Sequence, residues 1–220
     1  VFEMLNSNIA FTLCQMLTSG AVEALEAHAS EAQKEKYLRQ IISGNWSATM
    51  NLTEPQAGSD VGAVKTKAEP QPDGTYKIYG TKIYITYGDH DMAENIIHLV
   101  LARTPGAPEG TKGISLFIVP KFFVNDDGSL GDRNDVKCIG QEDKLGIHAS
   151  PTCVMSFGES DGAVGWLIGA ENTGMAAMFT MMNNARLNVG IQGVGLAEQA
   201  TQIAMSYATD RVQGLSLIHI

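Results

Sequence analysis

The chain has 220 residues, which is enough for one medium domain or two small ones. Hydrophobic residues make up 44% of it and charged residues 18%, so the composition predicts a buried core and argues against wholesale disorder. The 15 basic and 24 acidic side chains give a net charge of −9, which argues against a nucleic-acid or anionic-membrane surface. No stretch approaches the roughly 18 continuous apolar residues of a membrane span.

The cysteines indicate the compartment of the protein, and the chain ends indicate how much of it is present. Cys14, Cys138 and Cys153 form no close pair, which favours a reducing compartment, and we expect a cytoplasmic protein. The sequence begins at Val1, and its last six residues, 215–220, resemble a translated sequencing adapter. We therefore expect part of a larger protein that ends in a non-native tail.

The first part of the chain predicts helices. Apolar residues recur every three or four positions from Phe2 to about Leu25, the spacing of one helix face. Ser30 and Gln33 predict a capping box at the start of a second helix. Gly44 predicts the end of that helix.

From Trp46 to Ile168 the apolar pattern shifts toward a period of two. Runs rich in β-branched and aromatic residues, separated by turn signals, predict strands over 76–80, 83–86, 96–103 and 114–120. No helix-length pattern interrupts these strands. We therefore expect antiparallel connections and a small barrel or sandwich.

From Thr173 to Gln213 the pattern returns to helix. Its predicted apolar face consists of Met178, Met182, Leu187, Ile191, Val194, Ala197, Ile203 and Tyr207. The segment is longer than most globular helices, so it predicts a member of a helical bundle. The predicted fold class is α+β multidomain: a helical N-terminal part, a central antiparallel β-barrel or sandwich domain, and the start of a C-terminal helical bundle.

Two segments suggest chemistry. The octet Thr53–Asp60 is polar and turn-rich, and exposed amides beside Ser59 would suit a phosphate or the edge of a heteroaromatic ring. An ordinary loop is the alternative. Strand 83–86 places Tyr84 and Thr86 on one face, where they could pack against and hydrogen-bond a flat cofactor, although a tyrosine that covers the core would give the same pattern.

Other patterns favour structure over chemistry. His90, His98 and His148 lack metal-ligand spacing, and we expect His98 to lie in a strand. The methionines between 175 and 182 follow helical spacing and predict core. The glycines of 190–195 stand in the wrong order for a dinucleotide-binding fingerprint.

Taken together, six segments in order resemble the acyl-CoA dehydrogenase family of flavoproteins. They are 50–60, 65–68, 80–86, 112–120, 142–146 and 185–190. The segment Tyr87–Met92 further resembles a bacterial subgroup that includes 3-methylmercaptopropionyl-CoA dehydrogenases. The resemblance implies the end of an N-terminal helical domain over 1–45, a flavin- and acyl-CoA-binding β domain over 46–170, and the first long helix of a bundle over 171–214.

The resemblance also implies a reaction, the FAD-dependent α,β-dehydrogenation of an acyl-CoA thioester. A carboxylate removes the α-proton while the β-hydrogen leaves as hydride to the flavin, which yields a trans-2-enoyl-CoA. Ala185 stands where some relatives have the catalytic Glu, so we expect the base from a later bundle segment that is absent here. The catalytic residues of this chain are therefore unknown, and no metal is implied.

Carried over position by position, the resemblance implies two sets of binding residues. The FAD set is Met50, Asn51, Leu52, Thr53, Ser59, Tyr84, Ile85, Thr86 and Arg211, and the substrate set is Ser59, Asn183 and Arg186. Thr53 would donate to the isoalloxazine edge, Tyr84 would cover the ring and Thr86 would bond near it. Arg211 would reach the FAD pyrophosphate of a neighbouring subunit.

The implied partners are an acyl-CoA substrate, an electron-transfer flavoprotein as electron acceptor, and further copies in a homodimer or homotetramer of the full-length protein. We expect the 220-residue chain itself to be inactive and a weak flavin binder. An acyl-CoA oxidase or flavin monooxygenase on the same scaffold is one alternative, and a non-catalytic β-domain binding module is another. The preferred acyl chain, methylthiopropionyl or fatty acyl, stays open.

Overall fold

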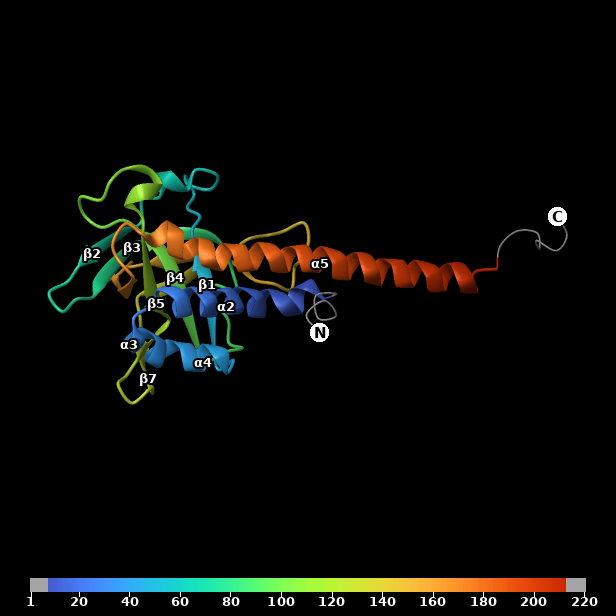
Figure 1. Cartoon of the computed structure of the whole chain (residues 1–220), viewed down its shortest axis with the longest axis horizontal. Coiled ribbons are helices and arrows are strands. Elements are labelled where there is room, and N and C mark those ends of the chain that lie inside the picture. Colours follow the sequence, from blue (N-terminus) through green and yellow to red (C-terminus); the bar gives the residue numbers. More distant parts are fainter. Residues whose placement is uncertain (1–7, 213–220) are drawn as a thin grey trace.

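The computed structural model describes residues 8–212 and shows a β body covered by two neighbouring helices, one of which projects far beyond it (Figure 1). The longer helices are α2 (Ile9–His28) and α5 (Gly174–Asp210). Between α2 and the first strand lie three short helical pieces, α3 (Glu31–Gln33), the π-helical turn η1 (Lys34–Leu38) and α4 (Arg39–Ile42). None of the helices in the described range has the length and hydropathy of a membrane span.

The capping box predicted at Ser30 is confirmed. The Ser30 hydroxyl accepts from the Gln33 amide at 3.3 Å, and the Gln33 side chain accepts from the Ser30 amide at 3.0 Å. Gly44 follows the helix with a φ of +81°, the left-handed conformation of a C-terminal stop. The predicted first helix begins in part outside the described residues, since residues 1–7 are not among them.

The central segment forms ten strands. They are β1 (Trp46–Asn51), β2 (Lys67–Pro70), β3 (Tyr76–Thr86), β4 (Asn95–Ala102), β5 (Ser115–Pro120), β6 (Phe122–Val124), β7 (Leu130–Arg133), β8 (Val136–Gln141), β9 (Thr152–Phe157) and β10 (Ala163–Ile168). Two 3₁₀ turns interrupt the loops, η2 (Val61–Ala63) and η3 (Gly110–Gly113). The two strands predicted over 76–80 and 83–86 are one long strand, β3.

The order helix, sheet, helix confirms the predicted fold class, but the expected strand connections need correction. The main sheet runs β1-β4-β5-β10-β3-β9-β8, with β2 paired to β3, and this path does not close into a barrel. β1 and β4 are parallel, because β2 and β3 intervene between them in the chain and pair elsewhere in the sheet. A crossover built from strands leaves no helical signal in the sequence, which is why only antiparallel pairs were expected.

Strand β10 bends the sheet into two packed halves. Its first part, Ala163–Gly165, pairs with β3, and its second part, Trp166–Ile168, pairs with β5. Alternate residues of β4 and β5 then face two separate cores. One core lies between the halves of the sheet and the other lies beneath the helices.

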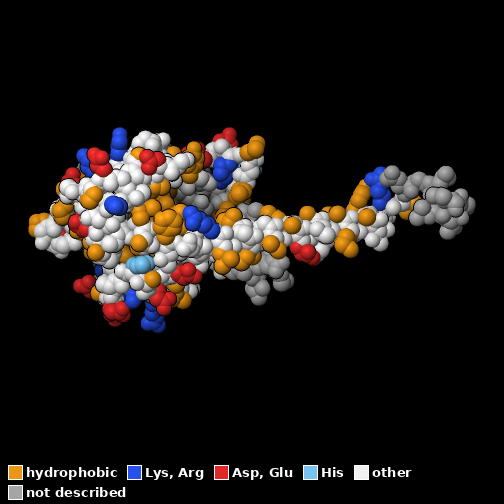
Figure 2. Space-filling view, turned by 45° about the horizontal axis from the view of Figure 1, so that its top comes forward, with side chains coloured by type: hydrophobic (Ala, Val, Ile, Leu, Met, Phe, Trp, Pro, Cys, Tyr) orange, Lys and Arg blue, Asp and Glu red, His pale blue; other side chains and the backbone are white. Residues whose placement is uncertain are grey.

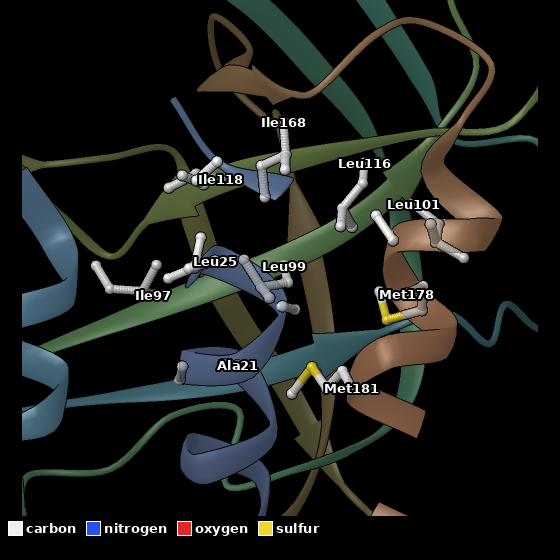
Figure 3. Close-up of a cluster of buried hydrophobic side chains, with 14 of the residues drawn as sticks. Ala21, Leu25, Ile97, Leu99, Leu101, Leu116, Ile118, Ile168, Met178 and Met181 are labelled. Atoms are coloured by element: carbon white, nitrogen blue, oxygen red, sulfur yellow. The ribbon is translucent and has the colours of Figure 1, made fainter. Parts of the chain in front are cut away.

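The core beneath the helices joins α2 and α5 to the sheet. Figure 3 shows side chains from α2, from three strands and from α5 converging there: Ala21, Leu25, Ile97, Leu99, Leu101, Leu116, Ile118, Ile168, Met178 and Met181. The methionines predicted as core are confirmed, because Met178 and Met181 are fully buried and Met175 and Met182 pack against the cluster. This core fixes the N-terminal half of α5 on the sheet.

The predicted apolar face of α5 is wrong for most of the helix. Leu187, Val194, Ile203 and Tyr207 are exposed, and Figure 2 shows hydrophobic side chains along the projecting part. The buried residues are Gly174, Ala177, Met178, Met181, Ala185, Asn188, Gln192 and Gly195. The packing partner selects this face, because α2 lies against it and the Gln192 amide donates to Thr12 Oγ1 at 3.5 Å.

Gly174 allows α5 to begin directly on the backbone of β5. A Cβ at this position would lie 2.4 Å from the Ser115 carbonyl carbon and 2.5 Å from the Leu116 nitrogen. The Gly174 amide also donates to the Ile114 carbonyl at 2.8 Å. No rearrangement of a flexible side chain could make room for a larger residue.

Two glycine-to-alanine changes in α5 should therefore have opposite effects. We expect Gly174→Ala to lower the free energy of unfolding by about 1–3 kcal/mol, since backbone must move to relieve the clash. Gly190→Ala, in open space on the same helix, should raise it by about 0.5–1 kcal/mol, since alanine favours the helical backbone. Urea unfolding followed by circular dichroism measures both, and equal effects would contradict this packing.

Candidate functional site

The two segments singled out for chemistry meet at the end of β1. The chain continues from β1 through Leu52 and Thr53, and the Thr53 carbonyl accepts from the Ile83 amide of β3 at 2.9 Å. Met50 and Leu52 are half-buried and pack against the core beneath the helices. The start of the octet therefore lies beside the strand that carries Tyr84.

Tyr84 is presented outward by an irregularity in β3. The pairing of β3 with β9 shifts register between Lys82 and Ile85, and Tyr84 adopts a φ of +59°. Its side chain is 59% exposed, whereas Ile85 is buried and Thr86 is half-buried. A bulge of this kind changes the direction of a side chain. Here it leaves the Tyr84 ring open to solvent next to the buried Ile85.

Helix α5 forms a cavity with the end of β1. A cavity of about 280 Å³ is lined by Met50, Met182, Ala185, Arg186 and Val189. The Arg186 guanidinium lies over the Phe179 ring at 5.7 Å, and both Arg186 and Asn183 are exposed. The cavity thus combines apolar walls with one cation, and none of the carboxylates in the described part of the chain lines it.

Asn51 is enclosed rather than presented at the surface. Its amide donates to Thr49 Oγ1 at 2.9 Å, and Thr49 Oγ1 lies 2.7 Å from His98 Nδ1. Asn51 Oδ1 and His98 Nε2 are buried polar atoms with no hydrogen-bond partner among the described residues. The Asn51 side chain is therefore enclosed, whereas Thr53 is half-buried and Tyr84 is exposed.

His98 lies in β4 as expected, and it is fully buried. Burial lowers the pKa of His98 to about 3, so the imidazole is neutral near pH 7. Its ring meets the Phe157 ring edge-on with centroids 5.8 Å apart. The hydrogen-bonded side chains of Asn51, Thr49 and His98 therefore form a neutral chain on the face of β1 opposite the helices.

The segment Tyr87–Met92 that follows Thr86 is anchored by charge. Asp89 accepts from Lys121 at 2.6 Å and from Arg133 at 3.2 Å. Burial raises the pKa of Asp89, but the two cations outweigh it and hold that pKa below its usual range. These ion pairs hold the loop against Lys121, which directly follows β5, and against Arg133 at the end of β7.

Two predicted residues lie apart from this cluster. Ser59 is exposed in the loop between the Glu54–Ala57 bridge and η2, and it does not line the cavity of Met50 and Arg186. Arg211 follows the far end of α5, where its guanidinium donates to the Tyr207 hydroxyl. Their assigned roles, and those of the other site residues, stay predictions.

A second and larger cavity of about 930 Å³ lies among the loops beyond Asp60. Its charged lining residues are Asp60, Lys65, Lys67, Glu69, Arg103 and Glu109. The donors of Arg103 are occupied by the backbone, because its guanidinium donates to the carbonyls of Val64 at 2.7 Å and Pro108 at 2.9 Å. Sequence reasoning did not anticipate this cavity.

Sequence reasoning also missed a buried ion pair beneath the site. Lys82 Nζ lies 2.8 Å from Glu54 Oε1, with both side chains almost fully enclosed. The signal was present as a lysine at an inward position of a strand, four residues after the buried Ile78. A lysine in a strand ordinarily indicates the solvent face.

Comparison with known proteins identifies the family. The family model described as "acyl-CoA dehydrogenase, middle domain" matches residues 49–160. The chain belongs to the acyl-CoA dehydrogenase family. It is 56% identical to the 3-methylmercaptopropionyl-CoA dehydrogenase of Ruegeria pomeroyi over 96% of this chain and 36% of that protein. It is 52% identical to a butyryl-CoA dehydrogenase of Syntrophomonas wolfei over 90% of this chain and 33% of that protein.

Solved structures of the family share this fold. The butyryl-CoA dehydrogenase of Megasphaera elsdenii superposes with a TM-score of 0.79 at 28% identity, over 98% of this chain and 53% of that one. The chain spans about a third of the length of the curated relatives it matches first. The strong likeness to a 3-methylmercaptopropionyl-CoA dehydrogenase agrees with the subgroup suggested by Tyr87–Met92.

The buried His98 predicts how stability depends on pH. The unfolded chain binds a proton near pH 6.5 and the folded chain only near 3, so stability is full above about 6.5 and is lost as the pH falls. We expect this one group to lower the free energy of unfolding by about 1 kcal/mol per pH unit between pH 6 and 4. In His98→Gln that part of the slope should vanish, and an unchanged slope in urea unfolding would refute the neutral buried imidazole.

Proposed function

We propose that this chain forms flavin- and acyl-CoA-binding surfaces of an FAD-dependent acyl-CoA dehydrogenase that converts an acyl-CoA to its trans-2-enoyl-CoA. The observation that carries the proposal is the cavity shared by Met50 of β1 and Arg186 of α5. Tyr84 lies one residue beyond Ile83, whose amide donates to the Thr53 carbonyl just after β1. Membership in the family supplies the reaction class.

The residues present suit an isoalloxazine ring. Met50 and Leu52 offer half-buried apolar surface, Tyr84 offers an exposed ring, and Thr53 and Thr86 offer hydroxyl groups. A flat heteroaromatic group needs such apolar faces with hydrogen-bonding groups at its edge. FAD, when bound, would supply the hydride acceptor.

The chain's own side chains have positioning roles in this proposal. Thr53 and Thr86 would hydrogen-bond the ring, and Tyr84 and Met50 would cover it and exclude water. Arg186 and Asn183 would orient the acyl-CoA from α5, and Ser59 would contact it from the octet. Because no carboxylate lines the cavity within the described residues, the α-proton would pass to a base elsewhere in the protein.

We also propose the partners that the fold favours. The exposed apolar side chains along α5 would be covered by further helices and by other copies in a homodimer or homotetramer. An electron-transfer flavoprotein would accept the electrons. One similar solved structure is described as the electron transferring flavoprotein of Acidaminococcus fermentans, with a TM-score of 0.81 at 29% identity over 96% of this chain and 52% of that one. The three free cysteines favour a cytoplasmic location.

Flavin titration tests the proposal on this chain. We expect FAD to bind, with quenched flavin fluorescence, and Tyr84→Ala to weaken binding about two- to tenfold through the lost ring contact. Tyr207→Ala removes an equally exposed tyrosine far along α5 and should leave the affinity unchanged. Addition of butyryl-CoA or 3-methylthiopropionyl-CoA should shift the flavin spectrum, and the stronger shift indicates the preferred acyl group.

Two outcomes would contradict the proposal. One is no FAD binding by the wild-type chain at millimolar concentration. The other is FAD binding that Tyr84→Ala and Tyr207→Ala weaken equally, which would place the flavin away from β3.

A further inference from the structure

Lys82 and Glu54 form a buried ion pair beneath the proposed flavin surface, which comprises Met50, Leu52, Thr53, Tyr84 and Thr86. The Lys82 side chain is fully buried and that of Glu54 is 4% exposed, with 2.8 Å between Nζ and Oε1. Neither residue belongs to the proposed binding set. Two opposite charges this deeply enclosed are uncommon, because each must be removed from water.

The pair ties three separate segments together. Lys82 Nζ also donates to the Leu52 carbonyl at 3.0 Å. The Glu54 carboxylate accepts from the Lys65 amide at 2.8 Å and from the Thr66 amide at 3.0 Å, and the Thr66 hydroxyl donates to it as well. One end of the pair therefore holds the backbone after β1, and the other holds the entry to β2.

These contacts bear directly on the residues proposed to meet the flavin. Thr53 stands between the Leu52 carbonyl and Glu54, and its own carbonyl accepts from Ile83, the neighbour of Lys82. Tyr84 follows two residues after Lys82 in a left-handed conformation that a tyrosine rarely adopts. Such a conformation persists only where the surroundings hold it, and the ion pair lies within two residues of it.

We infer that Lys82 and Glu54 are positioning residues that hold the Leu52–Thr53 backbone and the Tyr84 bulge in the relative arrangement needed to bind the flavin ring. This inference rests on the proposed function. Apolar residues of similar volume often replace a buried ion pair without loss of stability. The charged pair is therefore better explained by the arrangement it imposes than by the stability it adds.

The charges of the pair predict its working pH range. Burial lowers the pKa of Lys82 to about 8, although Glu54 opposes that change. Burial raises the pKa of Glu54, but Lys82 and the hydrogen bonds outweigh it and lower that pKa to about 2. Glu54 is the charged group that acts on Lys82, so the ion pair is intact between these pH values and is lost as the pH rises through about 8.

The test compares two lysine variants on the same strand. Lys82→Met removes the buried charge, while Lys77→Met breaks an equally short but exposed ion pair with Asp161. We expect hydrogen exchange at the amides of Lys65, Thr66 and Ile83 to accelerate at least tenfold in Lys82→Met and not in Lys77→Met. FAD affinity, from flavin fluorescence, should fall at least tenfold in Lys82→Met alone.

The pH profile separates positioning from a general loss of stability. FAD affinity of the wild-type chain should fall as the pH rises above about 8, and Lys82→Met should lack this step. Glu54→Gln keeps the volume and one acceptor oxygen but removes the charge and the second acceptor, so it should loosen the same contacts and bind FAD more weakly. If Lys82→Met fails to fold, Glu54→Gln and the wild-type profile decide the question.

The outcomes distinguish the inference from the proposed function. If neither the wild type nor Lys77→Met binds FAD, the proposed function is wrong, and the exchange experiment still tests what the pair holds. If both bind FAD, and Lys82→Met or Glu54→Gln matches them in affinity, exchange and pH profile, the positioning role is wrong while the proposed function stands.

Discussion

The candidate site depends on one junction, where the chain leaving β1 meets β3. A backbone hydrogen bond from Ile83 to Thr53 joins them, and the buried Lys82–Glu54 pair lies next to it. Around this junction the apolar core beneath the helices places α5 so that Arg186 and Met50 share a cavity. If the junction moved, the end of β1 and the Tyr84 bulge would lose their relative positions.

The two faces of β1 explain how one strand serves both stability and function. One face packs under α2 through Trp46 and Ala48. The other carries Thr49 and Asn51, which are hydrogen-bonded in series to the buried, neutral imidazole of His98. A strand supported on both faces is rigid, and a rigid strand suits the precise placement of a planar cofactor.

Local features were predictable from the sequence, because residues close in the chain determine them. The Ser30 capping box, the Gly44 stop and the position of α5 all belong to this class. The parallel pairing of β1 with β4 was not predictable, since it depends on where β2 and β3 pair. The face of α5 was misassigned because α2 accepts Asn188 and Gln192 and leaves Leu187 in solvent.

The site itself was predictable only in part, through resemblance. Met50 and Arg186 line one cavity, and Thr53 is hydrogen-bonded to β3 next to Tyr84, whereas Arg211 lies at the far end of α5. Lys82 was missed because its burial follows from a distant carboxylate, Glu54. The bulge that exposes Tyr84 was missed because a shift in strand register does not alter the residue composition of the strand.

Hydrogen exchange with and without saturating FAD tests the central claim most directly, since it maps where the flavin binds along the whole chain. The account predicts slower exchange over residues 50–54, 83–87 and 182–189, and no change around the larger cavity over 60–69 and 103–110. Protection confined to that larger cavity would contradict the account, because the flavin would then lie away from β1, β3 and α5.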